Sequence, residues 1–360
     1  MNSYWKSLSK TRKITNATVL VIFVVFIGGL LVWSQSSPTQ YMIEKPAKLV
    51  KTSSLYTSSK QAQTQTYIPV DQQVLTTHYR DVKRDRNKPA VKITHGQTDS
   101  QTISTSEYQK NLNGQTQSTW VTAEQLALKL AQVPYSSEPQ GVIISEVAAN
   151  QKTALKPGDR LSTMNGQPVT SAAQFNQAEN SLKADKSVKI TANRGSKKIT
   201  ADVKPLKSQN EKYHLGISAY DDVAISSSMD FDQTKELSKI GGTSYGLMLF
   251  TQMYFDSVGE NQIRIPSSVK ISGTGQITSD GRVMPVSGIE QKVYGAAKQG
   301  VTDFYVPNYP ATAKLKKIDR NYVNNYTVAK QTVKKYHLLM KIHPVTSVYD
   351  IIGNLDQLGS

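Results

Sequence analysis

Two side chains in the C-terminal half of the chain have the types and surroundings that nucleophilic catalysis needs. Ser244 follows paired glycines and precedes an apolar run over residues 246–250, which predicts a loop leading into a buried helix. Backbone N–H groups at such a helix start can stabilise a tetrahedral oxyanion, so Gly242 and Thr243 are candidate oxyanion-loop residues. The alternative for Ser244 is an ordinary helix-capping serine.

Lys292 is the candidate general base for Ser244. It lies in a predicted helix whose apolar stripe contains Ile289, Val293 and Ala296, and it projects from the same side. Burying an ammonium is costly, and a desolvated lysine can have its pKa lowered from about 10.4 towards roughly 7 to 8. The pattern therefore predicts an uncharged amine that removes the proton of Ser244. The alternative is a lysine that extends its ammonium to solvent.

A second module precedes these segments. Residues 141–147 predict a buried strand, and the Pro157-Gly158 and Asn165-Gly166 turns then bracket a short strand. Phe175 begins a helical apolar stripe, and residues 188–203 alternate as a hairpin.

This order of elements resembles a bacterial PDZ domain over residues 135–207. In that family an extended peptide adds as a strand beside one edge of the sheet. The resemblance implies that substrate binds along Gly141, Val142, Ile143 and Ile144, opposite the helix of Phe175. The alternative is a PDZ fold that acts only as a spacer.

The Ser244 and Lys292 segments together resemble the Lon protease domain, specifically that of membrane-anchored, PDZ-containing Lon-like proteases of Gram-positive bacteria. The resemblance covers residues 211–358 and includes the segments 273–277 and 280–286 between the two side chains. It implies a Ser-Lys dyad that hydrolyses peptide bonds through an acyl-enzyme, without a metal or other cofactor. The resemblance also implies cleavage without the ATPase module of full-length Lon, and the printed sequence, which contains no phosphate-loop motif, agrees with this.

The chain departs from this family beside the nucleophile. Thr243 and Tyr245 stand where Pro and Ala are common. A tyrosine is much larger than alanine, so it favours a crowded substrate cleft, narrowed specificity, or an inactive scaffold of the cell envelope whose PDZ groove binds peptides without cleaving them.

A rival enzyme class is suggested by residues 242–246, which match the G-x-S-x-G elbow of α/β-hydrolases. Asp303 and then His337 or His343 follow in the required order, but residues 235–239 make a poor strand before the elbow. The five histidines lack the spacing of a catalytic zinc site.

The N-terminal part predicts how the catalytic segments are held. Residues 14–34 form an uncharged apolar segment preceded by four basic residues, and about 20 such residues can span a bilayer with the basic side in the cytoplasm. We therefore expect a cytoplasmic tail over residues 1–13, a transmembrane anchor over 14–34, and an extracellular catalytic domain. A cleaved signal peptide is the alternative. Residues 35–134 predict a polar stalk and a membrane-proximal segment ending in a helix over 123–132.

Composition narrows the classes of partner. The net charge of +16 is spread without a basic block, which favours adhesion to anionic envelope polymers over binding of nucleic acid. The absence of cysteine excludes disulfides and a thiol nucleophile. The sequence thus predicts an α+β protein of the cell membrane that acts on exported peptides or proteins, and it leaves the oligomeric state open.

Overall fold

The chain is divided between two units that alternate along the sequence. The computed structural model describes residues 25–29, 38–39, 41–74, 77–95, 105–179, 181–183, 186–207, 213–259, 265–318 and 320–359. The smaller unit comprises Met1–Lys45 and Gln73–Gln97, and the larger comprises Pro46–Gln72 and Thr98–Ser360.

The smaller unit is built from short strands and one helix. β1 (Pro38–Thr39) pairs with β5 (Thr77–His78), and the first residues of β2 (Tyr41–Lys51) pair antiparallel with β6 (Lys92–His95). At the end of α3 (Tyr79–Asp85), the buried carboxylate of Asp85 lies 3.1 Å from Lys45 Nζ and 2.6 Å from Lys88 Nζ.

The structure contradicts the prediction of a transmembrane anchor over residues 14–34. Within the described ranges, no helix reaches the length and apolarity that crossing a bilayer requires. The described part of the predicted span is the helical segment 25–29, and a helix of this length rises only about 7.5 Å against a hydrocarbon core of about 30 Å. Residues 1–24 and 30–34 lie outside the described residues. The predicted single-pass location, with an extracellular catalytic domain, is corrected with it.

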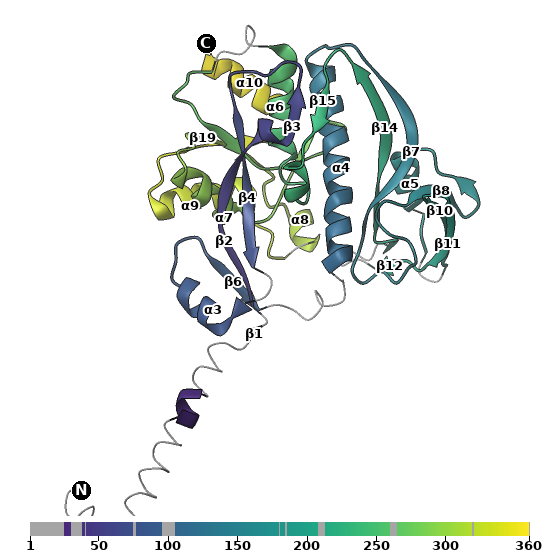
Figure 1. Ribbon diagram of the computed structural model, residues 1–360, viewed down its shortest axis with the longest axis horizontal. Helices are drawn as coiled ribbons and strands as arrows, with labels where there is room; N and C mark the ends of the chain where they lie inside the picture. Colours follow the sequence, from purple (N-terminus) through teal and green to yellow (C-terminus); the bar gives the residue numbers. More distant parts are fainter. Residues whose placement is uncertain are drawn as a thin grey trace, which may run out of the picture. The chain divides into compact units, whose positions relative to one another are not determined.

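A largely parallel sheet forms the centre of the larger unit (Figure 1). Its strands lie in the order β20-β19-β16-β4-β2, and the first three pairings are parallel. Their bounds are β4 (Thr66–Val74), β16 (Ile271–Gly273), β19 (Asp303–Pro307) and β20 (Lys341–Val345). The helices that accompany them are α6 (Gly246–Val258), α7 (Ile289–Lys298), α8 (Ala313–Ile318), α9 (Asn325–Tyr336) and α10 (Val348–Gly359).

The alternation of side chains along β19 explains why this sheet is covered on both faces. Phe304 and Val306 belong to an apolar cluster with residues of α7 and α9, whereas Tyr305 belongs to a second cluster with residues of α6 and α10. Successive strand residues point to opposite faces, so a strand buried on both faces is apolar throughout. The predicted α+β class is corrected to a mixed α/β fold.

Short elements complete this part of the unit. β3 (Tyr56–Ser58) pairs with β15 (Phe231–Gln233), and β17 (Gln276–Ile277) pairs with β18 (Val283–Met284). Two 3₁₀ turns are η1 (Thr52–Leu55) and η3 (Leu237–Lys239).

A second sheet, in the order β11-β10-β8-β7-β14, corresponds to the segment that resembles a PDZ domain. Its strands are β7 (Tyr135–Val147), β8 (Arg160–Met164), β10 (Val188–Arg194), β11 (Lys197–Val203) and β14 (Ile217–Ser227), and β9 (Gln167–Pro168) pairs with β8. The helix α5 (Ala172–Glu179) contributes Phe175 to its core. β12 (Leu206–Lys207) and β13 (Tyr213–His214) pair just before β14. The predicted hairpin over residues 188–203 is confirmed by the pairing of β10 with β11.

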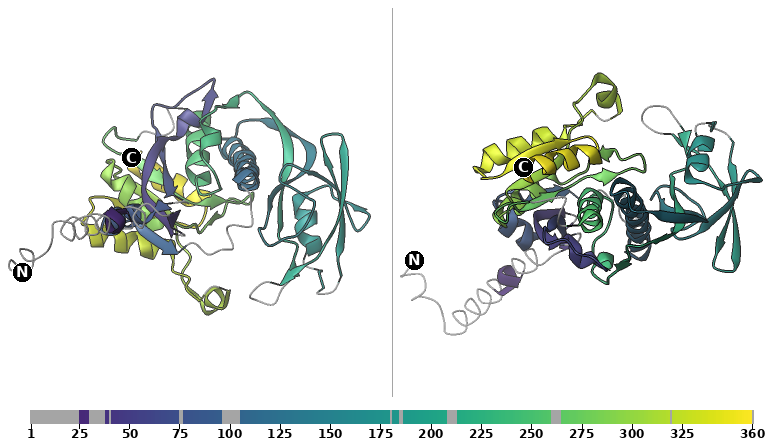
Figure 2. Two further views of the ribbon diagram at one scale, coloured as in Figure 1. Left: turned by 60° about the horizontal axis from the view of Figure 1, so that its bottom comes forward. Right: turned by 90° about the horizontal axis from the view of Figure 1, so that it is seen from above.

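One long helix, α4 (Thr105–Leu130), packs against α6 on one side and against β7 and β14 on the other (Figures 1 and 2). The sequence predicted only its C-terminal part, because apolar residues at helical spacing begin late in the helix. The polar first half is held by contacts with distant elements: Asn111 Nδ2 donates to the carbonyl of Val147, and Thr116 Oγ1 lies 3.2 Å from the carbonyl of Ile240.

The described residues of the predicted polar stalk over 35–66 are folded into both units. Leu55 and Tyr56 are buried in the same apolar cluster as α6, and the Tyr56 ring makes edge contacts with Trp120 and Phe231. A few apolar side chains are therefore enough to hold this segment in the core. Because most of its residues are polar, its composition suggested a stalk.

Candidate active site

The loop that carries Ser244 is held in place by the segment following β16. Thr274 Oγ1 and the Gly275 N–H donate to the Ser244 carbonyl at 2.9 and 2.8 Å. Gly242 has φ +85°, a backbone conformation that favours glycine, and lets the chain turn before α6. Ser244 is half-buried, so its position is fixed while the residue retains contact with solvent.

Lys292 reaches Ser244 from α7. Its side chain lies on the buried side of the helix, as predicted, and is only 2% exposed. The Nζ atom lies 3.1 Å from Ser244 Oγ and 3.0 Å from the Ser287 carbonyl oxygen. It also lies 3.1 Å from Asp71 Oδ2 on β4. The alternative in which Lys292 extends to solvent is therefore excluded.

Tyr245 points into the protein core. Its side chain is 1% exposed, its hydroxyl donates to the Thr116 carbonyl of α4 at 3.3 Å, and burial raises the pKa of that hydroxyl. The ring is thus directed away from the half-buried Ser244. The expectation that Tyr245 crowds a substrate cleft is wrong, because the helix start turns this residue inwards.

The start of α6 limits where an oxyanion can bind. The N-cap residue is Tyr245, so Ser244 is not the capping serine of the alternative hypothesis. The Gly246 N–H bonds to the Thr243 carbonyl and the Leu247 N–H bonds to the Gly275 carbonyl. These two helix-start donors are therefore engaged, and the predicted oxyanion loop of Gly242 and Thr243 lies directly before them.

The histidines of the hydrolase alternative make other contacts. His343 Nε2 lies 2.8 Å from Asp303 Oδ1, and its ring stacks on Tyr305. His337 ends α9 in a left-handed conformation. A 3₁₀ turn, η3, rather than a strand, precedes the Ser244 loop. The G-x-S-x-G match is therefore not placed in an α/β-hydrolase elbow.

The strand predicted to bind peptide has both edges paired. β7 pairs with β14 along its length, including Gly141 and Val142, and it also pairs with β8 at Val142 and Ile143. Val142 and Ile144 are fully buried. Strand addition at residues 141–144 therefore lacks the open edge that it requires.

Phe175 likewise belongs to the core. It is 1% exposed and packs in the same apolar cluster as Val142 and Ile144. Its predicted role in contacting substrate is corrected to a packing role.

β14 is the terminal strand of this sheet within the part of the chain that the structure describes. The helix α5 lies alongside it: the Ala172 N–H donates to Asp221 Oδ1 at 2.6 Å, and the Leu215 N–H donates to Glu179 Oε1 at 2.8 Å. The available edge therefore comes from the segment that follows the predicted PDZ boundary, not from its first strand.

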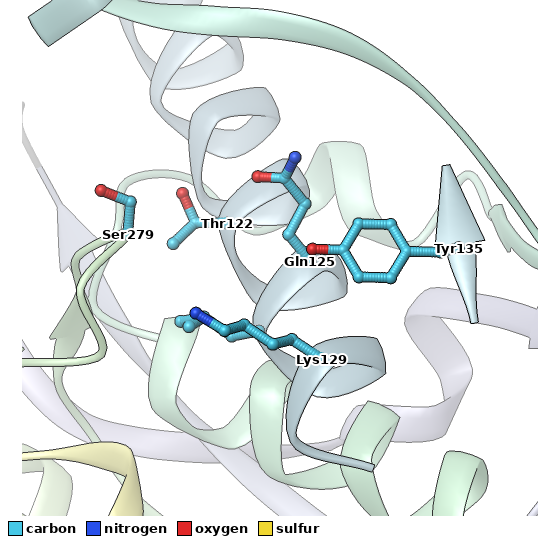
Figure 3. Close-up of a pocket in the computed structure, with 6 residues that line it drawn as sticks. Thr122, Gln125, Lys129, Tyr135 and Ser279 are labelled. Carbon is cyan, nitrogen blue, oxygen red and sulfur yellow. The ribbon is translucent and has the colours of Figure 1, made fainter. Parts of the chain in front are cut away.

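A polar pocket lies along α4, apart from the Ser244–Lys292 pair. Figure 3 shows Thr122, Gln125 and Lys129 on the helix, with Tyr135 and Ser279 on either side. Gly246 begins α6 directly after the Ser244 loop, and a Cβ there would meet Thr119 of α4. The pocket and the Ser244 loop therefore both lie against α4, but neither Ser244 nor Lys292 lines the pocket.

Comparison with known families agrees with these two parts of the larger unit. A model of the Lon protease (S16) C-terminal proteolytic domain matches residues 194–343, and a model of the PDZ domain matches residues 114–204. The Lon-type domain indicates a serine protease family, and the PDZ domain indicates peptide or protein substrates.

Comparisons with individual proteins add little. No curated protein matches the chain. The crystal structure of the PDZ domain of the SdrC-like protein from Listeria monocytogenes is 24% identical, covers 23% of this chain and 90% of that one, and has a TM-score of 0.21. A similarity of this extent carries no argument about function.

Sequence reasoning missed Asp71, which lies outside both matched segments. It occurs in the stretch Pro69-Val70-Asp71-Gln72, which carries no catalytic motif. Only the placement of β4 beside β16 brings it towards Lys292.

Proposed function

We propose that this protein is a serine endopeptidase that cleaves peptides or unfolded protein segments without ATP. Ser244 is the nucleophile and Lys292 is the general base. The observation that carries the proposal is the 3.1 Å separation of Lys292 Nζ and Ser244 Oγ, in a pair whose lysine is almost fully buried. Nucleophile and base within hydrogen-bonding distance are the geometric requirement for covalent catalysis by serine.

Acylation begins with uncharged Lys292. Its amine takes the hydroxyl proton of Ser244 as Oγ bonds to the scissile carbonyl carbon. The carbon–nitrogen bond then breaks, the leaving amine takes the proton from the Lys292 ammonium, and the acyl group remains on Oγ as an ester. In deacylation a water molecule gives a proton to Lys292 and attacks the ester, which releases the carboxylic acid and returns the proton to Ser244.

The tetrahedral intermediates carry a negative oxygen that needs donors. We assign this role to backbone N–H groups of the loop containing Gly242 and Thr243. The engagement of the Gly246 and Leu247 N–H groups by other carbonyls supports this choice. Loss of one such donor typically costs about 10² to 10³ in turnover.

Substrate is presented by strand addition to β14. Its terminal position among the described strands and its neighbour α5 support this site over the fully paired β7. An added strand gains main-chain hydrogen bonds without a fixed sequence requirement, which suits unfolded substrates. The absence of a phosphate-loop motif from the printed sequence supports cleavage whose rate is unchanged by ATP.

The test uses the full chain with an unfolded protein and a peptide library, with new termini identified by mass spectrometry. Ser244→Ala and Lys292→Met are expected to lose activity by roughly 10⁴-fold or more. Lys298→Met is the matched control, because Lys298 lies on the same helix but is exposed. Its activity is expected to equal that of the parent.

Two outcomes would contradict the proposal. Undiminished cleavage by Ser244→Ala would assign the reaction to another residue. A parent chain that binds peptides but cleaves none would instead favour the scaffold alternative.

A further inference from the structure

Asp71 enters the candidate site from a part of the chain distant from both reactive residues. It lies near the C-terminal end of β4, which pairs with β16 in parallel through Thr66 and Tyr67. β16 leads directly to the Thr274-Gly275 segment that holds the Ser244 loop. The sheet therefore brings a carboxylate from the N-terminal third of the chain to Lys292.

Among the described residues, three oxygen atoms lie about 3 Å from Lys292 Nζ. They are Ser244 Oγ at 3.1 Å, the Ser287 carbonyl oxygen at 3.0 Å and Asp71 Oδ2 at 3.1 Å. An ammonium has three N–H donors and no acceptor. The arrangement thus gives each oxygen a donor while Lys292 is charged.

Loss of one proton leaves the amine two N–H donors and one lone pair. The carbonyl oxygen of Ser287 and the carboxylate of Asp71 can only accept hydrogen bonds from it, whereas the hydroxyl of Ser244 can also donate one. When both acceptors retain their donors, the lone pair is directed at the Ser244 proton. Asp71 therefore orients the uncharged amine of Lys292, in addition to stabilising the ammonium form.

The start of α7 helps to hold this carboxylate. A Cβ at Gly288, the N-cap residue of α7, would lie 3.0 Å from Asp71 Oδ2 and 3.2 Å from Oδ1. Gly288 therefore lets the carboxylate approach the helix start closely, and its φ of +73° favours glycine independently. A negative charge is also stabilised near a helix N-terminus.

We infer that Asp71 is a positioning residue of this protease, which orients the Lys292 amine towards Ser244 and sets the pH at which that amine becomes available. The inference rests on the proposed function. Asp71 contacts Lys292, so its role is exerted through the base.

Of the carboxylates near Lys292 among the described residues, Asp71 is the one that contacts Nζ and stabilises its charged form. Ser244 faces Nζ from the loop before α6, and the Ser287 carbonyl faces it from the segment before α7. Glu290, on the same helix as Lys292, instead bonds to Lys335 and Tyr336 of α9 at 2.8 Å each. A neighbouring carboxylate favours the charged lysine, so removing the charge of Asp71 frees the base at lower pH.

The experiment compares Asp71→Asn, Asp71→Ala and Asp71→Glu in the full chain, with kcat and KM measured from pH 5 to 10. In Asp71→Asn the midpoint of the rising limb of kcat is expected to move down by about one pH unit or more. Asp71→Ala is expected to lower the plateau of kcat by about 10²-fold with KM unchanged, because the amine is no longer oriented. Asp71→Glu retains the charge and is expected to keep the midpoint of the parent. Asp230→Asn, an exposed carboxylate elsewhere in the unit, is the control.

A second measurement does not depend on catalysis. In Ser244→Ala chains, the rate at which an amine-reactive reagent modifies Lys292 is followed by mass spectrometry as a function of pH. Adding Asp71→Asn is expected to shift the midpoint of this modification in the same direction as that of kcat.

Unchanged midpoints in both measurements would overturn the role of Asp71 while leaving the proposed function intact. The proposed function would fail separately, through full activity of Ser244→Ala. A purely structural role of Asp71 would lower thermal stability and activity of Asp71→Ala without moving any midpoint, and would also overturn the inference.

Discussion

The Lon-like and PDZ-like parts of the larger unit differ in how directly their candidate functional residues follow from sequence. In the Lon-like part, Ser244 and Lys292 come from two separate local motifs, and their side-chain atoms lie 3.1 Å apart. In the PDZ-like part, the predicted strand exists, but β8 and β14 occupy its two edges. Side-chain chemistry leaves a local signature, whereas the availability of a strand edge depends on which distant segment pairs with it.

Beyond Ser244, Lys292 and Asp71, the largest effect is expected at the loop that carries Ser244, in the part whose candidate residues follow from local motifs. Thr274→Val removes the 2.9 Å hydrogen bond to the Ser244 carbonyl at a site that is 1% exposed. Since a displacement of about 1 Å can cost 10²-fold, kcat is expected to fall by about that factor with KM unchanged. Steady-state kinetics measure this, with Thr278→Val in the exposed β17–β18 turn as the control. Equal effects of both substitutions would show that the hydrogen bond from Thr274 does not position Ser244.

A second prediction concerns α4, which contacts both parts. Burial raises the pKa of Glu124 to about 7, nearby Asp232 adds to this, and the hydrogen bond from Trp120 Nε1 opposes it. The folded state therefore retains a proton that the unfolded state has released, so this group makes stability fall as pH rises from about 4.5 to about 7.

Glu124→Gln removes this dependence. Relative to the parent, its free energy of unfolding is expected to be about 1 to 3 kcal/mol higher at pH 8 and nearly equal at pH 4. Urea titrations at both pH values measure the difference. A constant difference across the range would assign the effect to packing instead of ionisation.

The smallest expected effect concerns the PDZ-like part and tests whether peptide binds at the edge of β14. At a peptide concentration of about ten times Kd, amides at the outer edge of β14 are expected to exchange with solvent deuterium about tenfold more slowly. Amides of β7 already lie between two strands and should change little. Hydrogen exchange in Ser244→Ala, read by mass spectrometry, keeps the peptide intact. New protection in β7 alone would restore the original assignment of residues 141–144.

The same distinction explains the errors outside the two sites. Polar composition suggested a stalk before residue 66, yet Leu55 and Tyr56 are core residues because α4, α6 and β15 cover them. Tyr245 suggested a crowded cleft, but it is buried, and its hydroxyl bonds to the Thr116 carbonyl of the distant helix α4. In each case the direction of a side chain depends on elements that are far away in sequence.

By itself the sequence determined the nucleophile and base candidates, the order of the PDZ-like strands and the buried side of the Lys292 helix. These properties follow from residue type and from periodicity over a few turns or strands, which are local. Only the tertiary structure decided which strand edge remains available, where Tyr245 points and that Asp71 meets Lys292. Those properties follow from pairings between segments far apart in the chain, and local preference does not encode such pairings.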